Sequence, residues 1–272
     1  MGDRCFNHCP SLTSINIPSS VTLLGDECFF LCSSLTSINI PSSVTLLGDE
    51  CFAYCSSLIS INIPSSVIGE LCFFKCTSLT SVNISSSVTK IGDRCFEHCT
   101  SLSSVNIPSS VTILGERCFW ACTSLTSVTI PSSVTKLGYG CFYNCESLSS
   151  IDIPSSVTEL PSNCFACCYS LSNVNIPLSV TELGESCFWA CTSLASIELP
   201  SSVTKLGDKC FCRSYKLSVL RCYATSVPSV GDNVFGSTKY TSDDGYLYVP
   251  EESIDLYKNA SQWGSWRHIQ KL

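Results

Sequence analysis

Cysteine is the residue type in this chain with the most potential for chemistry, and its spacing is regular. The sequence contains 22 cysteines, most of them in a C-F-x-x-C motif that returns about every 23 residues. The first cysteines of the motif are Cys5, Cys28, Cys51, Cys72, Cys95, Cys118, Cys141, Cys164, Cys187 and Cys210, and the second are Cys9, Cys32, Cys55, Cys76, Cys99, Cys122, Cys145, Cys168 and Cys191. Such columns could bind metal, form disulfides, or pack as thiols.

The spacing favours reduced thiols that pack as small apolar side chains. C-x-x-x-C is not the C-x-x-C spacing of zinc sites, and the histidines His8, His98 and His268 do not accompany it, so we predict no metal and no cofactor. Two cysteines four positions apart on a helical turn are poorly aimed for bridging. Neighbours within one column, roughly 5 Å apart, could form disulfides, which remain the alternative.

Carboxylates form a second regular column just before each C-F-x-x-C motif. Asp26, Asp49, Asp93 and Asp208 follow a glycine, and Glu116 occupies the same position. We expect these side chains to cap the free N–H groups of a short helix. They do not form an acid–base pair, no histidine lies near a candidate nucleophile, and no glycine-rich phosphate loop occurs. The sequence therefore predicts a protein that is not an enzyme.

The elements that position these columns belong to a repeated unit, of which Ser34–Ser56 is a clear copy. In this unit Leu35, Ile38 and Ile40 form an L-x-x-I-x-I strand with one buried face. A proline then stops the strand, and a second apolar pair ends at Gly48, which we take as a flexible position. One unit cannot bury both of its apolar clusters, but stacked copies can. The period predicts an α/β, right-handed leucine-rich-repeat solenoid with parallel strands on one face and short helical turns opposite.

The repeats assign residues 1–216 to the solenoid and residues 217–272 to a C-terminal strand-helix cap. The cap should contain a strand over 245–250 and a helix over 251–260. Only 21 residues separate Cys51 from Cys72, and we expect a local flattening there without a break. The chain begins in mid-repeat, so we expect missing upstream repeats or an end-to-end contact through this uncapped edge.

Composition excludes several partners. The net charge is −7 and charged residues are only 14% of the chain, which argues against binding to nucleic acid. No run of 18 apolar residues occurs, so this segment should not insert into a membrane. No signal peptide or anchor is visible, and we expect the natural start to lie upstream.

The repeated pattern L-x-S-[IV]-x-I-P-S-S-V-T-x-[IL]-G-x-x-C-F-x-x-C-x-S resembles the BspA-like leucine-rich repeat of the Treponema pallidum type. That family usually has Ala where the first cysteine of the motif stands here. The ending, CYATSVPSVGDNVF followed by GYLYVPEESIDLYKNASQWGSW, resembles the C-terminal segment of such proteins in gut Bacteroides-type bacteria. The resemblance implies a secreted or surface-displayed, non-enzymatic protein that adheres to host matrix proteins or to other bacteria.

Two surfaces are candidates for partner binding. The first is the exposed face of the strands, a neutral Ser/Asn surface that becomes acidic toward its C-terminal end. Its candidate residues are Asn39, Asn62, Asn83, Asn106, Thr129, Asp152, Asn175 and Glu198. The uniformity of this face also fits a sheet that is polar only for solubility, since hot spots need large anchors.

The second surface consists of the aromatic residues that follow Cys-Phe in the motif. They are Phe30, Phe74, Trp120, Tyr143 and Trp189. If they face solvent, they form an aromatic stripe suited to a protein or a glycan. The favoured alternative is that these rings pack over neighbouring coils.

We therefore expect a cell-surface module that binds a macromolecular host or bacterial partner, most simply a surface or matrix protein and possibly a glycan. The alternative is a passive spacer with no ligand site. The single threonine column, broken at Ile68, is too narrow for the flat Thr arrays of ice-binding proteins.

Overall fold

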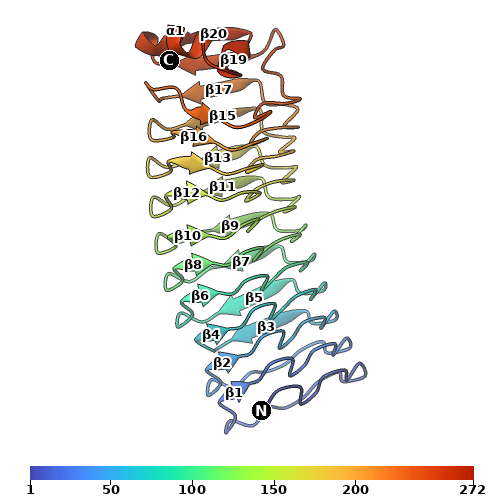
Figure 1. The fold of residues 1–272 in the computed structure, drawn as a ribbon. Coiled ribbons are helices and arrows are strands. Elements are labelled where there is room, and N and C mark those ends of the chain that lie inside the picture. The colour runs from blue at the N-terminus through green and yellow to red at the C-terminus, as the bar shows by residue number, and fades with distance from the viewer. The chain divides into compact units, whose positions relative to one another are not determined.

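A computed structural model describes residues 1–272 (Figure 1). The fold is a solenoid of about 11 turns, about 23 residues apart, with parallel strands and very little helix. Contacts divide it into two compact units, Met1–Glu146 and Ser147–Leu272. The predicted solenoid of parallel strands is confirmed.

In the first unit the coils from Ser60 onward contribute to two sets of strands. The strand that we predicted at Leu35, Ile38 and Ile40 is reduced to an isolated parallel bridge between Asn39 and Asn16. The longer strands carry the predicted L-x-x-I-x-I pattern, and they are β3 (Ser60–Ile63), β5 (Ser81–Ile84), β7 (Ser104–Asn106) and β9 (Ser127–Thr129). The two-residue strands, which we did not predict, are β1 (Leu23–Leu24), β2 (Leu46–Leu47), β4 (Val67–Ile68), β6 (Lys90–Ile91), β8 (Ile113–Leu114) and β10 (Lys136–Leu137). Every pairing is parallel.

The second unit repeats this arrangement and adds a terminal segment. Its longer strands are β11 (Ser150–Asp152), β13 (Asn173–Asn175), β15 (Ser196–Leu199), β17 (Val219–Cys222), β19 (Tyr246–Val249) and β20 (His268–Lys271). Its short strands are β12 (Glu159–Leu160), β14 (Glu182–Leu183), β16 (Lys205–Leu206) and β18 (Ser229–Val230). The helical elements are η1 (Glu251–Ser253), α1 (Ile254–Lys258) and η2 (Trp263–Ser265).

A stack of phenylalanines runs through the core of each unit. In the first unit the ring of Phe96 lies 5.4 Å from Phe73 and 5.5 Å from Phe119, nearly parallel to both. In the second unit Phe211 stacks on Phe188 at 5.6 Å and on Phe235 at 6.1 Å. Because each ring fills the space between its neighbours, burial is shared between coils and no coil is stable alone.

The C-F-x-x-C segment does not form the helical turn that we predicted. The N–H groups of Glu50, Phe52 and Tyr54 donate to carbonyls of the next coil at 2.7 to 2.9 Å, so they are not available for helix hydrogen bonds. The backbone alternates to achieve this, with φ of 53° at Glu50 and 62° at Tyr54. Both values lie in the left-handed region, which side chains other than glycine adopt uncommonly. The turn is therefore a third ladder of hydrogen bonds between coils.

The shortened repeat keeps its place in the stack, as predicted. Leu46 and Leu47 of β2 pair with Val67 and Ile68 of β4. Phe52 stacks on Phe73 at 5.5 Å across the same step. The sheet of short strands β1, β2 and β4 ends at the shortened repeat, and β6 begins the next sheet, with β8 and β10.

The C-terminal strand and helix that we predicted are present as β19 and α1. The Tyr257 hydroxyl donates to the carbonyl of Ala224 at 2.8 Å, and the indole N–H of Trp263 donates to Pro228 at 2.9 Å. Repeat-type contacts extend as far as Phe235, which is also covered by Trp263 and Trp266 at 5.3 and 5.4 Å. The boundary between solenoid and cap at residue 217 stays a prediction.

Candidate binding surfaces

All eight predicted residues of the strand face are exposed, because they alternate with buried aliphatic residues along each strand. In the first unit Asn62 pairs with Asn83 and Asn106 with Thr129. In the second unit Asp152 pairs with Asn175. The face is thus a regular surface of small polar groups, and its role in binding stays a prediction.

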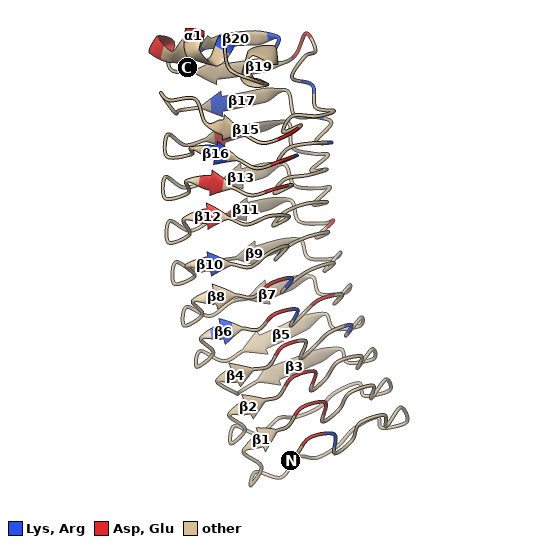
Figure 2. Cartoon of the chain, in the orientation of Figure 1, with Lys and Arg blue, Asp and Glu red and all other residues tan.

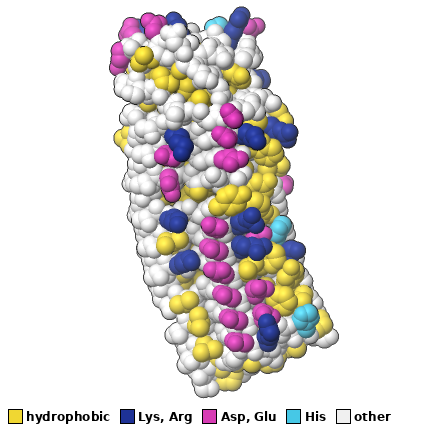
Figure 3. All heavy atoms as spheres, in the orientation of Figure 1, with side chains coloured by type: hydrophobic (Ala, Val, Ile, Leu, Met, Phe, Trp, Pro, Cys, Tyr) yellow, Lys and Arg dark blue, Asp and Glu magenta, His cyan; other side chains and the backbone are white.

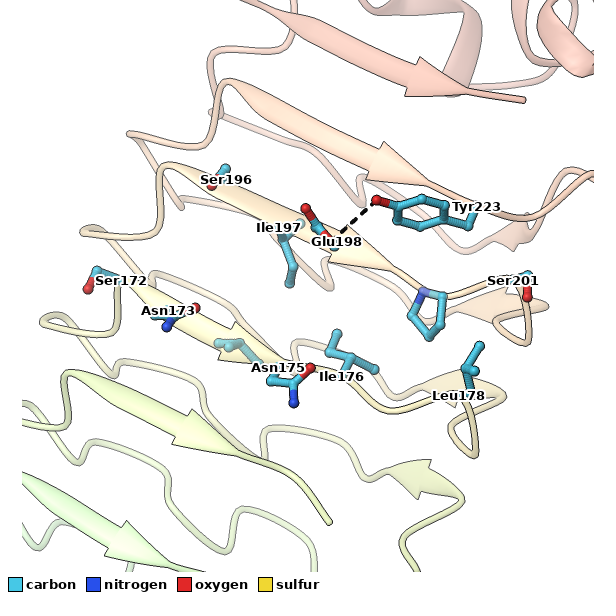
Figure 4. Close-up of a pocket in the computed structure, with 12 residues that line it drawn as sticks. Ser172, Asn173, Asn175, Ile176, Leu178, Ser196, Ile197, Glu198, Ser201 and Tyr223 are labelled. Carbon is cyan, nitrogen blue, oxygen red and sulfur yellow. Dashed lines mark hydrogen bonds between the residues drawn. The ribbon is translucent and has the colours of Figure 1, made fainter. Parts of the chain in front are cut away.

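One part of this face is hollowed. A pocket of about 510 Å³ lies over β13 and β15 in the second unit, and Figure 4 shows its lining. It brings together Asn175 and Glu198, two of the predicted residues, with Leu178 and Tyr223, which we did not predict. The Tyr223 hydroxyl donates to Oε2 of Glu198 at 3.4 Å.

The carboxylate column is formed, but its predicted role as a helix cap is wrong. Oδ1 of Asp26 accepts the N–H of Asp49, at the same position of the next coil, at 2.9 Å. Asp3 accepts the N–H of Asp26 in the same way at 3.0 Å. Figure 2 shows this acidic column along the turns, and Figure 3 shows it at the surface. The carboxylates therefore join successive coils while remaining open to solvent.

An aromatic ridge runs beside this column in the first unit. We define it as His8, Phe30, Tyr54, Phe74 and His98, whose rings follow one another at 5.3 to 6.1 Å. Phe74 is buried, Phe30, Tyr54 and His98 are half-buried, and His8 is exposed. The rings therefore pack over neighbouring coils and also present edges to solvent.

Basic side chains cover parts of this ridge. Lys75 Nζ lies 5.2 Å from the centre of the Tyr54 ring and 5.3 Å from that of Phe74. The guanidinium of Arg94 lies 5.2 Å from the Phe74 ring and donates to Glu97 at 2.6 Å. These cation–π contacts fix the long side chains against the rings.

A second aromatic group, which we name the Trp120 cluster, consists of Arg117, Trp120, Tyr139 and Tyr143. Trp120 and Tyr143 stack at 3.8 Å, and Tyr139 lies 6.4 Å from Trp120. The Arg117 guanidinium lies 4.8 Å from the Trp120 ring and 5.6 Å from that of Tyr139. All four side chains are half-buried.

Gly140 makes the Trp120 cluster possible. A Cβ at this position would lie 2.7 Å from the indole of Trp120, and the backbone has φ of +56°. Trp120 and Tyr143 were predicted from the sequence, whereas Tyr139 and Arg117 were not. A signal for Tyr139 was present in the sequence, because Gly-Tyr-Gly stands at 138–140 where most other repeats have Gly followed by an acidic residue.

A hollow of about 440 Å³ borders the Trp120 cluster. It shares Arg117 and Tyr139 with the cluster, and its other lining residues are Glu70, Leu71, Asp93, Arg94 and Glu116. Three carboxylates and two guanidinium groups thus surround a depression next to the half-buried rings of the cluster. Trp189, the remaining predicted aromatic, lies in the second unit, half-buried, with the Arg213 guanidinium 5.2 Å from its ring.

The cysteine columns are free thiols, all of them buried except Cys5 and Cys9. From Cys32 to Cys145 the second thiol of each motif donates to the carbonyl of a phenylalanine in the preceding coil, as Cys99 does to Phe73 at 3.2 Å. Burial raises the pKa of the Cys28 thiol from its ordinary value of 9.0 to about 12. Buried neutral thiols of this kind pack and hydrogen-bond, in agreement with the favoured prediction.

Each of the three histidines packs against an aromatic ring. His8 and His98 lie in the aromatic ridge, and His268 stacks on Tyr246 at 4.7 Å. No group of three or more His, Cys, Asp or Glu side chains is arranged to hold a metal ion. None of the helices has the length and apolar character needed to cross a bilayer.

Comparison with known structures agrees with this description. The chain is similar to a leucine-rich repeat protein from Bacteroides ovatus at 26% identity, over 98% of this chain and 80% of that one, with a TM-score of 0.59. It is similar to a leucine rich cell surface protein from Faecalibacterium prausnitzii at 26% identity, over 100% and 82% of the two chains, with a TM-score of 0.60. A leucine-rich repeat protein of T. pallidum is also 26% identical, over 67% of this chain and 78% of that one, with a TM-score of 0.50.

A comparison with curated protein sequences gives no significant match. The sequence pattern described as "BspA type Leucine rich repeat region" matches residues 1–126 and 115–241 and accounts for six copies. These two segments contain nearly all of the coils described above. The chain therefore belongs to the BspA type leucine-rich repeat family.

Proposed function

We propose that this chain is a non-enzymatic module, displayed on a bacterial surface, that binds a partner protein through the turn side of its first unit. The single observation that carries the proposal is the Trp120 cluster. Trp, Tyr and Arg are the residues most enriched in interface hot spots, and here Arg117, Trp120 and Tyr143 are stacked together and half-exposed.

Pre-organisation supports this site. Stacking fixes the rings before any partner arrives, so little side-chain entropy is lost when it binds. The adjacent hollow presents Glu70, Asp93 and Glu116 to the partner. We therefore expect a partner surface that carries Lys or Arg beside apolar or aromatic side chains.

Surface display rests on similarity. The relative from Faecalibacterium prausnitzii is described as a cell surface protein, and repeat folds commonly present their surfaces to binding partners. A host matrix protein or a protein on another bacterium fits this setting. We therefore extend the proposal from protein binding in general to adhesion to such a partner.

Biolayer interferometry of the purified chain against matrix proteins, fibrinogen and mucins tests the proposal. We expect saturable binding that falls at least about tenfold in Trp120→Ala and in Arg117→Ala, in line with a loss of roughly 1.4 kcal/mol or more per hot-spot side chain. Trp189→Ala, at the same repeat position in the second unit, is the matched control and should bind normally. Circular dichroism and thermal melting check that each variant is folded.

The second candidate function is a passive spacer. It is favoured by the uniform Ser and Asn side chains of the exposed strand face, which offer no large anchor residue. Absence of saturable binding to every protein tested, with a folded chain, would support the spacer and contradict the hot spot. Equal loss of binding in the Trp120 and Trp189 variants would also contradict it.

A further inference from the structure

The pocket over β13 and β15 is built by residues that depart from the repeat. Leu178 stands where the neighbouring coils have Ser155 and Ser201, and Asn173 stands where they have Ser150 and Ser196. These departures from the repeat cluster around one pocket. A sheet face that is polar only for solubility would not need such changes, so they favour a ligand site.

The two residues at the C-terminal side of the pocket are also departures. Glu198 is a carboxylate in a column of mostly asparagines. Leu199 pairs with Cys222, so Tyr223 takes the place that Pro200 has in the previous coil. Tyr223 thereby brings an aromatic ring with a hydroxyl group to the end of the strand, and that hydroxyl bonds to Glu198.

The lining combines apolar surface with neutral hydrogen-bonding groups. Leu178 is 72% exposed and Tyr223 is 41% exposed. Val174 in the floor is half-buried, whereas its neighbours in the sheet, Ile151 and Ile197, are buried. Exposed apolar groups beside amides and a carboxylate suit a ligand with both apolar and polar faces.

The charges of the lining select among ligand classes. No Lys, Arg or His lines the pocket, so phosphate, sulfate and carboxylate ligands find no counter-charge. Glu198 is the single carboxylate, and Tyr223 already donates to one of its oxygens. A cationic peptide could pair only with the Glu198 carboxylate, which already accepts a hydrogen bond from Tyr223. Most of the remaining polar lining consists of amides and serine hydroxyls.

We propose that this pocket binds a neutral sugar residue of a glycan. Sugar hydroxyls both donate and accept, so they match the amides of Asn173 and Asn175 together with the acceptor oxygens of Glu198. The C–H face of a pyranose ring would lie against Tyr223 and Leu178, which removes apolar surface from water. The volume of about 510 Å³ is within the range of small-ligand sites and accommodates one or two sugar units.

The pocket lies in the second unit and the Trp120 cluster in the first, so the two binding activities are separable by mutation. The test is saturation-transfer difference NMR and isothermal titration calorimetry of the full chain. The probes are glucose, galactose, mannose, N-acetylglucosamine and N-acetylgalactosamine, with their short oligomers. A sialylated oligosaccharide and a Lys/Arg-rich peptide are included to test the charge argument.

We expect saturable binding of at least one neutral sugar, weakened about tenfold or more in Asn175→Ala and in Glu198→Gln. Tyr223→Phe keeps the ring and should retain most of the binding, while Tyr223→Ala should lose it. Leu178→Ser restores the repeat residue without threatening the fold and should also weaken binding. Asn106→Ala, at the Asn175 position of the first unit, is the matched control and should bind as the original chain does.

Three outcomes would overturn the proposal. They are an absence of saturable binding to every neutral sugar, binding confined to the sialylated probe or to the basic peptide, and sugar binding that is unchanged in the pocket variants. Loss of protein binding in Trp120→Ala does not bear on it, because that variant leaves the pocket intact.

Discussion

The carboxylate of Asp49 accepts a 2.7 Å hydrogen bond from the backbone N–H of Glu70, at the same position of the next coil. This bond crosses the shortened repeat, so the acidic column is continuous where two residues are missing. The aspartates of the column thus have a structural role, since Asp3, Asp26, Asp49, Asp93 and Asp208 each satisfy a donor that the turn leaves without a partner.

Asp49→Ala should lower the stability of the chain by roughly 0.5–1.5 kcal/mol, because it leaves the N–H of Glu70 without its acceptor. Asp49→Asn keeps a side-chain oxygen at the same place and should cost less. Urea unfolding followed by circular dichroism measures both. Equal destabilisation by the two substitutions would show that negative charge, rather than the hydrogen bond, is what matters there.

Gly48→Ala should destabilise the chain by about 1–3 kcal/mol, the usual cost of forcing atoms into a packed site. A Cβ at Gly48 would lie 2.6 Å from the backbone nitrogen of Asp26 in the previous coil. The glycine is therefore required by close approach between coils, and not for flexibility as we predicted. Gly2→Ala is the matched control, since a Cβ there meets nothing within 4 Å. A Gly48→Ala melting temperature equal to that of the control would refute this explanation.

Phe96→Ala should cost roughly 3–5 kcal/mol, because it leaves a cavity in a fully buried stack between Phe73 and Phe119. Phe30→Ala removes the same atoms from a half-buried position in the aromatic ridge and should cost clearly less. Thermal and urea unfolding of the two variants gives the comparison. Similar losses would mean that the ridge contributes to the core as strongly as the phenylalanine stack.

Cys5 and Cys9 should react with a thiol reagent in the folded chain, because the former is exposed and the latter half-buried. The other thiols are buried and should react only when the chain unfolds. Colorimetric thiol counting with and without denaturant measures this, and the denatured chain should give the full 22. A smaller number in denaturant without reductant would reveal disulfides between coils.

Stability should fall as the pH rises above about 9. Burial raises the pKa of Cys28 from 9.0 to about 12, so between these values the folded state holds a proton that the unfolded state has lost. The contribution is complete below pH 9 and disappears as the pH approaches 12. Melting temperatures measured from pH 7 to 11 in constant reductant should show the decline. Cys28→Ala should show a shallower decline than the original chain, and an unchanged slope would contradict the assignment.

The sequence by itself determined the period, the positions of the long strands from Ser60 onward and the burial of the C-F-x-x-C cysteines after Cys9. These features follow from alternation along a strand and from a repeat that cannot bury its apolar residues alone. Asn62 and Asn83 were placed on the exposed face because they alternate with isoleucine or valine, a relationship that is local in the chain. The strand and helix of the C-terminal segment were readable for the same reason.

Only the tertiary structure decided the backbone conformation of the C-F-x-x-C turns. It also decided which of the residues that depart from the repeat contact one another. The turn around Cys51 and Cys55 has the spacing of a helix, but hydrogen bonds to the next coil outweigh the local preference and set φ positive at Glu50 and Tyr54. Arg117 reaches Tyr139 and Glu198 reaches Tyr223 because neighbouring coils are in fixed register. Contacts between coils depend on that register and on the direction of the side chains. Neither can be deduced from the sequence of a single repeat.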